Sequence, residues 1–121
     1  MFNLINDEKI KSFSDNLFGN MNVLVLDNKP YFPADYVSIS LQNDTSTISR
    51  VCKLEEPHAV NHNMFYQTGV KAFNEPILTE IPILFIDEDN VRELVSISTS
   101  DIVKDLEKWI FEEIIPSFNK K

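Results

Sequence analysis

The sequence predicts an α+β fold in one small domain, with a β-hairpin and a short antiparallel sheet packed against several helices, the last one long and ended by a proline. Three patterns carry this prediction. An apolar, largely β-branched run at 23–26 is followed by turn residues and a second short run. Residues 77–86 are again rich in strand formers. Residues 102–115 repeat apolar side chains at helical spacing.

Length and composition bound the class of protein. The 121 residues correspond to one domain, and 43% hydrophobic with 25% charged residues is ordinary for a globular protein. The single cysteine, Cys52, excludes an intramolecular disulfide, and two glycines leave no glycine-rich phosphate loop. Residues 1–18 lack the apolar run of a signal peptide, and no stretch is long enough to cross a membrane. We therefore expect a cytoplasmic protein.

The first predicted element is an N-terminal helical extension over residues 1–18. Ile10, Phe13 and Leu17 recur at helical spacing, and Gly19 would end the helix. A hairpin is expected next. Its first strand covers 21–26, its turn is Asp27-Asn28-Lys29, and its second strand covers 30–32, because Asn tolerates the left-handed conformation of tight turns.

The middle of the chain gives weaker signals. Pro33 suits the first turn of a helix over 34–41, and residues 47–53 could add one or two helical turns. Residues 54–74 show no clear pattern. Pro76 and Pro82 argue against a regular central strand at 77–86, so an edge strand or a bulge is expected there.

Two helices are predicted in the C-terminal third. Asp87 is expected to cap the first, with Val91, Leu94 and Val95 facing the core. The second runs to about residue 115, where Pro116 ends it. On a helical wheel its core stripe includes Trp109, and the stripe as a whole consists of Ile102, Val103, Leu106, Trp109, Ile110 and Ile114.

Glu113 falls inside that apolar stripe. A buried carboxylate must be paired, hydrogen-bonded or protonated. We therefore expect Glu113 to be a structural residue paired with Arg50 or Arg92, and Glu113→Ala to cost about 1–3 kcal/mol.

Phe111 and Ile115 fall outside the stripe, on or beside the charged face. They lie four residues apart, so their side chains would adjoin on a helix, next to Lys108 and Glu112. Grouped exposed apolar residues mark interfaces. These four residues are the candidate contact surface for a target protein or for a second copy in a homodimer. The alternative is that a neighbouring element covers Phe111 and Ile115.

Three motifs follow one another in the chain. They are Tyr31-Phe32-Pro33-Ala34-Asp35-Tyr36-Val37, Phe85-Ile86-Asp87-Glu88 and Trp109-Ile110-x-x-Glu113-Ile114-Ile115-Pro116-Ser117-Phe118. Together they resemble the Bro-N domain, which occurs in baculovirus repeated-ORF proteins and phage antirepressors. The resemblance covers residues 19–119. The family's Leu-Gly-Tyr after the first helix reads Leu41-Gln42-Asn43 here. The resemblance implies a small α/β domain in a viral or prophage regulator without enzymatic activity.

The charge distribution bears on the partner. The formal net charge is −8, and the stretch from Glu75 to Glu113 alone carries all of it. Such a surface repels DNA, because phosphate binding needs clustered basic residues. A protein partner, such as a repressor with a basic DNA-reading surface, is favoured.

Two alternatives stay open. A DNA-binding regulator would need a patch from Arg50, Lys53 and Lys71, or from Lys104, Lys108, Lys120 and Lys121. An acidic DNA mimic that inhibits a host defence protein would need neither.

A catalytic or metal site is weakly indicated. Cys52, His58 and His62 have ligand chemistry, but zinc sites show tighter paired spacings. The acidic run from Asp87 is better explained by helix capping. We expect no enzymatic activity, no metal and no cofactor.

Overall fold

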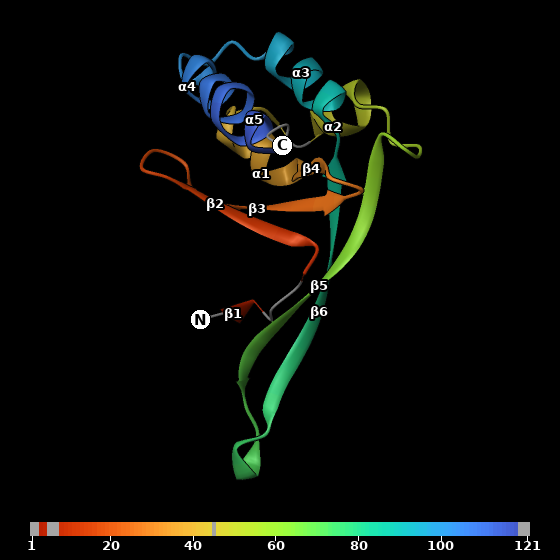
Figure 1. Cartoon of the computed structure of the whole chain (residues 1–121), viewed down its shortest axis with the longest axis vertical. Helices are drawn as coiled ribbons and strands as arrows, with labels where there is room; N and C mark the ends of the chain where they lie inside the picture. Colours follow the sequence, from red (N-terminus) through yellow and green to blue (C-terminus); the bar gives the residue numbers. More distant parts are fainter. Residues whose placement is uncertain (1–2, 5–7, 45, 119–121) are drawn as a thin grey trace.

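Six antiparallel strands form one sheet, in the order β1-β5-β6-β4-β3-β2, in the computed structural model, which describes residues 3–4, 8–44 and 46–118 (Figure 1). The predicted α+β class is confirmed. The strands are β1 (Asn3–Leu4), β2 (Ile10–Asp15), β3 (Gly19–Leu26), β4 (Lys29–Pro33), β5 (Ala59–Val70) and β6 (Pro76–Ile86). The helices are α1 (Ala34–Ser40), α2 (Ser46–Val51), η1 (Ala72–Asn74), α3 (Glu88–Ile97), α4 (Val103–Lys108), η2 (Trp109–Ile114) and α5 (Ile115–Phe118).

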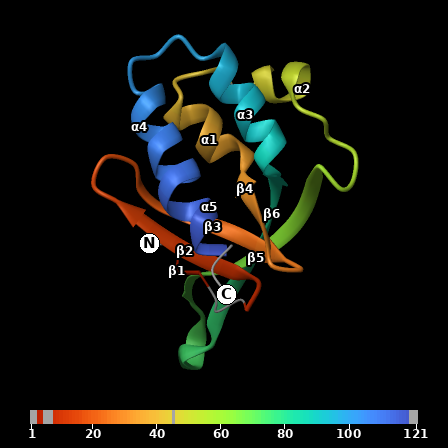
Figure 2. The ribbon, with the colours of Figure 1, turned by 45° about the horizontal axis from the view of Figure 1, so that its top comes forward.

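The helices α1, α3, α4 and α5 lie over one face of the sheet, above β3 and β4 (Figure 2). Between these layers lies the main core, in which the predicted core residue Trp109 is buried and stacks on Phe18. A smaller cluster of Leu24, Tyr31, Met64 and Phe85 lies apart from this core. Val23 belongs to the first cluster and Leu24 to the second, because neighbouring residues of a strand point to opposite faces. The sheet therefore has apolar side chains on both faces.

The predicted hairpin is confirmed. Asp27 and Asn28 have φ values of 51° and 62°, which is the conformation of a two-residue type I′ turn between β3 and β4. The Asn28 side chain also donates to the carbonyl of Phe118, 3.0 Å away, which ties this turn to the end of the last helix.

The prediction of a helical N-terminal extension is wrong for its described part. Residues 10–15 form β2, which pairs with β3 from Ile10 opposite Leu24 to Asp15 opposite Gly19. The helical spacing was a weak signal, and the free edge of β3 offers backbone hydrogen bonds that override it. Leu17, expected on the apolar face of the helix, is 57% exposed. Residues 1–2 and 5–7 of the extension lie outside the described residues.

Helix α1 ends in a Schellman motif. The N–H groups of Gln42 and Asn43 donate to the carbonyls of Ile39 and Ser38, each at 2.9 Å. Gln42 occupies the left-handed position of this motif with φ of 60°, where glycine is the usual residue. The departure from the Leu-Gly-Tyr pattern therefore falls on the one position where a side chain strains the backbone.

The patternless segment before Pro76 contains a strand that the sequence did not predict. The polar residues of β5 include Asn61 and Asn63, which lie with Phe65 on an exposed face of the strand, so the segment lacks the apolar run by which a strand is recognised. The register of the two strands shifts between Gln67 and Gly69 of β5, not within 77–86 where a bulge was one of the two expectations. Pro82 is tolerated because, in the described chain, β4 pairs with β6 only at Phe85 and Ile86.

The last helix differs from the predicted one in its central part. From Trp109 to Ile114 it is π-helical, with wider turns than an α-helix. Its buried residues are Leu106, Trp109, Ile110, Ile114 and Phe118, and all of them except Trp109 recur at every fourth position.

This geometry corrects two predictions. Glu113 is exposed, because the wider turns rotate it out of the apolar stripe, and Arg92 pairs with Glu88 at 3.0 Å instead. Pro116 lies inside the helix, which continues to Phe118. A proline is tolerated there because it falls in the first turn of the new α-helical segment α5.

Candidate interaction surfaces

Asp87 caps helix α3 as predicted and also organises the preceding loop. Its Oδ1 accepts the N–H of Asn90 at 3.0 Å, and its Oδ2 lies 2.8 Å from Nδ1 of His58. The Asn90 side chain forms further hydrogen bonds to the backbone of the same loop. It accepts the N–H of Lys53 at 2.8 Å and donates to the carbonyls of Lys53 and His58 at 2.8 and 3.1 Å. We call Asn90, with these contacts, the loop clamp.

The hydrogen bonds around the loop clamp explain why residues with metal-ligand chemistry lie close together here. In the described ranges, the group of three residues close enough to hold a metal ion is His58, Asp87 and Asp89, whereas Cys52 and His62 are not part of it. Both oxygens of Asp87 are already hydrogen-bonded within the protein. A structural role therefore explains the arrangement.

Cys52 is not placed as a nucleophile. Burial, together with the negative charges of Asp87 and Glu93, raises the pKa of its thiol to about 11. The thiol is therefore protonated at neutral pH, and the reactive thiolate is scarce.

The candidate contact surface is partly assembled around Phe111. The guanidinium of Arg92 lies 4.2 Å from the centre of the Phe111 ring, in a cation–π contact. Glu88 holds the same guanidinium through two hydrogen bonds of 3.0 and 3.3 Å. Lys108 and Glu112 line an open hollow with Phe111, which also contains Arg92, Lys104 and Glu107.

Ile115 is separate from this hollow. Both Ile115 and Phe111 are half-buried and pack against the main core. Arg92 of α3 covers one face of Phe111. The structure thus brings Lys108, Phe111 and Glu112 together at one hollow. Ile115 lies apart from them because the wide turns of η2 change the angle between Phe111 and Ile115 around the helix.

The acidic residues gather on the outside of the helices. Residues 88–113 contain eight acidic and three basic residues. Except for the half-buried Glu88, these acidic side chains are exposed. We call the exposed surface of α3, α4, η2 and the turn before α4 the acidic helical face. Its acidic residues are Asp89, Glu93, Asp101, Asp105, Glu107, Glu112 and Glu113.

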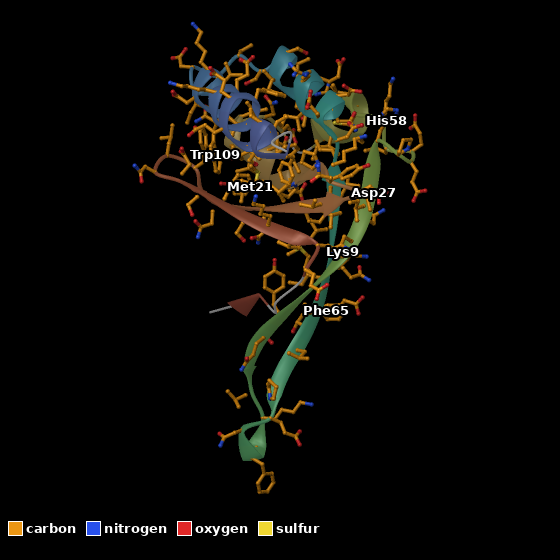
Figure 3. All side chains as sticks on the ribbon, in the orientation of Figure 1. Lys9, Met21, Asp27, His58, Phe65 and Trp109 are labelled. Atoms are coloured by element: carbon orange, nitrogen blue, oxygen red, sulfur yellow. The ribbon has the colours of Figure 1, made fainter. Side chains whose placement is uncertain are left out.

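The β5–β6 hairpin forms an arm that projects away from the helices (Figure 1). Figure 3 shows His58 near its upper end and Phe65 farther along it, beyond the strands β2 and β3. The arm exposes large apolar side chains, namely Phe65, Val70, Phe73, Ile77 and Leu78. Its formally charged residues are Lys71, Glu75 and Glu80. The arm was not predicted from the sequence, because its first strand was not recognised.

The tip of the arm presents an aromatic side chain on strained backbone. Phe73 is 97% exposed, and its φ of 65° lies in the left-handed region that bulky residues avoid. Asn74 follows with φ of 61°, and the N–H of Lys71 closes the tip on the carbonyl of Glu75 at 2.6 Å. Such strain is concentrated at recognition sites.

Among the residues that the structure describes, the basic side chains do not form the patches that DNA binding would need. Lys71 lies next to the tip of the arm, whereas Arg50 belongs to α2 at the far end of the molecule (Figure 1). Lys104 and Lys108 do share a hollow, but Glu107 and Glu112 line it too. Lys120 and Lys121 lie outside the described residues.

Comparisons of the chain with protein families, with curated proteins and with solved structures find no match. None of the helices in the described part of the chain has the length and apolar character needed to cross a membrane.

Proposed function

We propose that this chain is a non-enzymatic regulator of the antirepressor kind, which acts inside a host cell by binding another protein through the acidic helical face. The observation that supports this proposal is the separation of charge in the fold. The acidic side chains of residues 88–113 lie on the exposed surface of the helices, away from the weakly charged arm.

The chemistry of this face favours a basic partner. Opposite charge on two surfaces speeds their encounter and selects the partner. A repressor's DNA-reading surface has this charge, since it must bind phosphates. Phe111 beneath Arg92 adds an aromatic and an arginine side chain, which are the residue types that contribute most at protein interfaces.

The experiment is affinity capture from a lysate of the host, followed by identification of the captured protein and binding with that protein purified. The variant Glu107→Lys/Glu112→Lys reverses two charges beside Phe111. Its matched control, Glu75→Lys/Glu80→Lys, makes the same change of net charge on the arm. We expect the first variant to lose the partner and the control to keep it. Equal binding by both variants would refute the proposed surface.

DNA binding is tested separately with plain duplex DNA. We expect no mobility shift at sub-micromolar protein in about 150 mM salt, because the acidic helical face repels phosphates. A shift that weakens steeply as salt rises would instead favour the DNA-binding alternative, in which Lys104 and Lys108 belong to one of the two candidate basic patches. A captured DNA-binding enzyme in place of a repressor would favour the DNA-mimic alternative.

A further inference from the structure

Strand β2 forms one edge of the six-stranded sheet. In the described chain it pairs with β3 alone, and that pairing runs without a shift in register from Ile10 to Asp15. The strand contains no proline. It therefore has neither a bulge nor a proline, two features by which edge strands commonly avoid pairing with another strand.

The hydrogen bonds between β2 and β3 show which backbone groups of β2 face outwards. The N–H of Val25 donates to the carbonyl of Lys9 at 2.7 Å, so these two residues form a hydrogen-bonded pair. Such pairs alternate along an antiparallel ladder, so the odd-numbered residues of β2 bond to β3. The N–H and C=O groups of Ser12 and Ser14 accordingly point away from β3, where a further strand can bind them.

The odd-numbered side chains of β2 lie on the face of the sheet that carries the helices. Phe13 packs against the main core and against Phe118, with the two ring centres 6.0 Å apart. The amine of Lys11 lies 5.4 Å from the centre of the Phe13 ring and 5.3 Å from that of Phe118. Lys11 is thus held over this face. It does not extend past the edge, where a lysine would obstruct an incoming strand.

Asp15 lies at the end of β2, on the same face as Lys11 and Phe13, because side chains alternate along a strand. Its Oδ2 accepts the N–H of Leu17 at 2.8 Å and that of Phe18 at 3.2 Å. One oxygen makes both bonds, so Oδ1 can still accept a hydrogen bond from a cation. The edge strand therefore carries a base and an acid, each two residues from Phe13.

We propose that two copies of the chain form a dimer in which their β2 strands pair antiparallel about a two-fold axis at Phe13. In this register Ser12 of each copy lies opposite Ser14 of the other copy, and the outward backbone groups make hydrogen bonds between the copies. Lys11 of each copy lies opposite Asp15 of the other. The contact is the same for both copies, as a two-fold axis requires, and the sheet becomes continuous across the dimer.

The backbone and the side chains select this register together. Outward groups must meet outward groups, so the axis can lie at Ser12, at Phe13 or at Ser14. An axis at Ser12 places Lys11 opposite Phe13, and an axis at Ser14 places Asp15 opposite Phe13. The axis at Phe13 places opposite charges face to face on both of its sides and two aromatic rings at its centre, which are favourable cross-strand pairs.

The edge is electrically neutral in an otherwise acidic chain. The whole chain carries a formal net charge of −8, whereas residues 8–15 contain two acidic and two basic residues, namely Glu8, Lys9, Lys11 and Asp15. The contact uses none of the residues of the acidic helical face. Self-association through that face would bring like charges together, whereas pairing through β2 leaves it available to a partner protein.

Sedimentation velocity of the purified chain over about 5 to 200 μM tests the proposal, and we expect a dimer that dissociates on dilution. Lys11→Glu should weaken the association about tenfold or more, because it places like charges opposite each other on both sides of the axis. The matched control is Lys29→Glu on β4. It makes the same change of charge at a lysine that also lies over an aromatic ring, 5.4 Å from the centre of Tyr31. The control should change the association less than about twofold.

A second variant tests the backbone pairing. Ser14→Pro removes an outward N–H that β3 does not use, and its ring occupies the edge. We expect a folded monomer, whereas Ser14→Ala should associate like the wild type. Circular dichroism and melting temperature establish that each variant is folded. If Ser14→Pro does not fold, the comparison of Lys11→Glu with Lys29→Glu decides.

A disulfide identifies the register. In a Cys52→Ser background, Phe13→Cys places the new cysteine opposite its own copy, where the two Cα atoms are about 4.5 Å apart and within range of a disulfide. We expect this variant to cross-link in air. Ser14→Cys should not cross-link, because Ser14 lies opposite Ser12 and is offset from its own copy by two residues. Cross-linking of Ser14→Cys alone, or of neither variant, would overturn the register.

A wild-type chain that stays monomeric to about 200 μM would overturn the proposal. Equal weakening by Lys11→Glu and Lys29→Glu, or a folded Ser14→Pro that still dimerises, would overturn it as well. These measurements use the purified chain alone and do not depend on the proposed function. A monomer that still captures its partner through the acidic helical face would refute the dimer and leave the function standing.

Discussion

Removal of the loop clamp is expected to destabilise the fold by about 3 kcal/mol in the variant Asn90→Ala. The Asn90 side chain is buried and makes three hydrogen bonds to the backbone of Lys53 and His58. Each is worth about 1 kcal/mol in net terms. The helix cap itself is retained, because Asp87 bonds the backbone N–H of residue 90.

Urea unfolding, followed by the fluorescence of the buried Trp109, measures this loss. For a chain of this length, about 3 kcal/mol lowers the melting temperature by roughly 10 °C. The matched control is Asn61→Ala, which removes the same atoms from an exposed position on β5 and should cost less than about 0.5 kcal/mol.

A second variant separates hydrogen bonding from packing. Asn90→Asp keeps the shape but replaces the donating amide with an acceptor that faces two carbonyl oxygens and lies near the carboxylate of Asp87. We expect it to be at least as destabilising as Asn90→Ala at neutral pH. If Asn90→Ala costs no more than Asn61→Ala, water replaces the clamp and the reasoning is refuted.

Three further predictions concern single side chains. Glu113→Ala should change stability by less than about 0.5 kcal/mol, because the side chain is exposed; a loss above 1 kcal/mol in urea unfolding would show a missed partner. Gln42→Gly should leave stability unchanged or raise it by up to about 1 kcal/mol, whereas Gln42→Val should cost about 1–2 kcal/mol, since φ is 60°. Melting curves that rank Val above Gly would contradict this. Cys52 should react with iodoacetamide at pH 8 about a hundredfold more slowly than a cysteine with the ordinary pKa of 9.0, because its pKa is about 11. The folded state holds this proton between pH 9 and 11 while the unfolded state loses it, so Cys52 contributes stability that is lost over that range. A rate equal to that of the unfolded chain would show that Cys52 is not shielded.

Local chemistry was enough to predict the elements whose signals lie within a few residues. Asp27-Asn28 specifies a tight turn because both residues tolerate positive φ. Asp87 specifies a helix start because its side chain accepts a backbone N–H three residues later. The apolar runs on either side of these signals then predicted the α+β class, and the helical spacing predicted the core residues of the last two helices, including Trp109.

The tertiary structure determined the strands whose pairing partners are distant in the chain. Residues 10–15 become β2 because β3 offers a free edge, and β5 forms from polar residues because β6 pairs with it along its whole length. A pattern read over one segment does not contain the backbone of another segment, so neither strand could be predicted from its own side chains.

The surfaces divide in the same way. The acidic charge of residues 88–113 is determined by the sequence alone, since almost any fold exposes so many carboxylates. The exposure of Glu113, the cation–π contact of Phe111 with Arg92 and the projecting arm are decided only by the tertiary structure. A π-helical segment rotates the side chains of Glu113 and Phe111, and the long pairing of β5 with β6 forms the arm. Both features depend on backbone hydrogen bonds that residue identity does not specify.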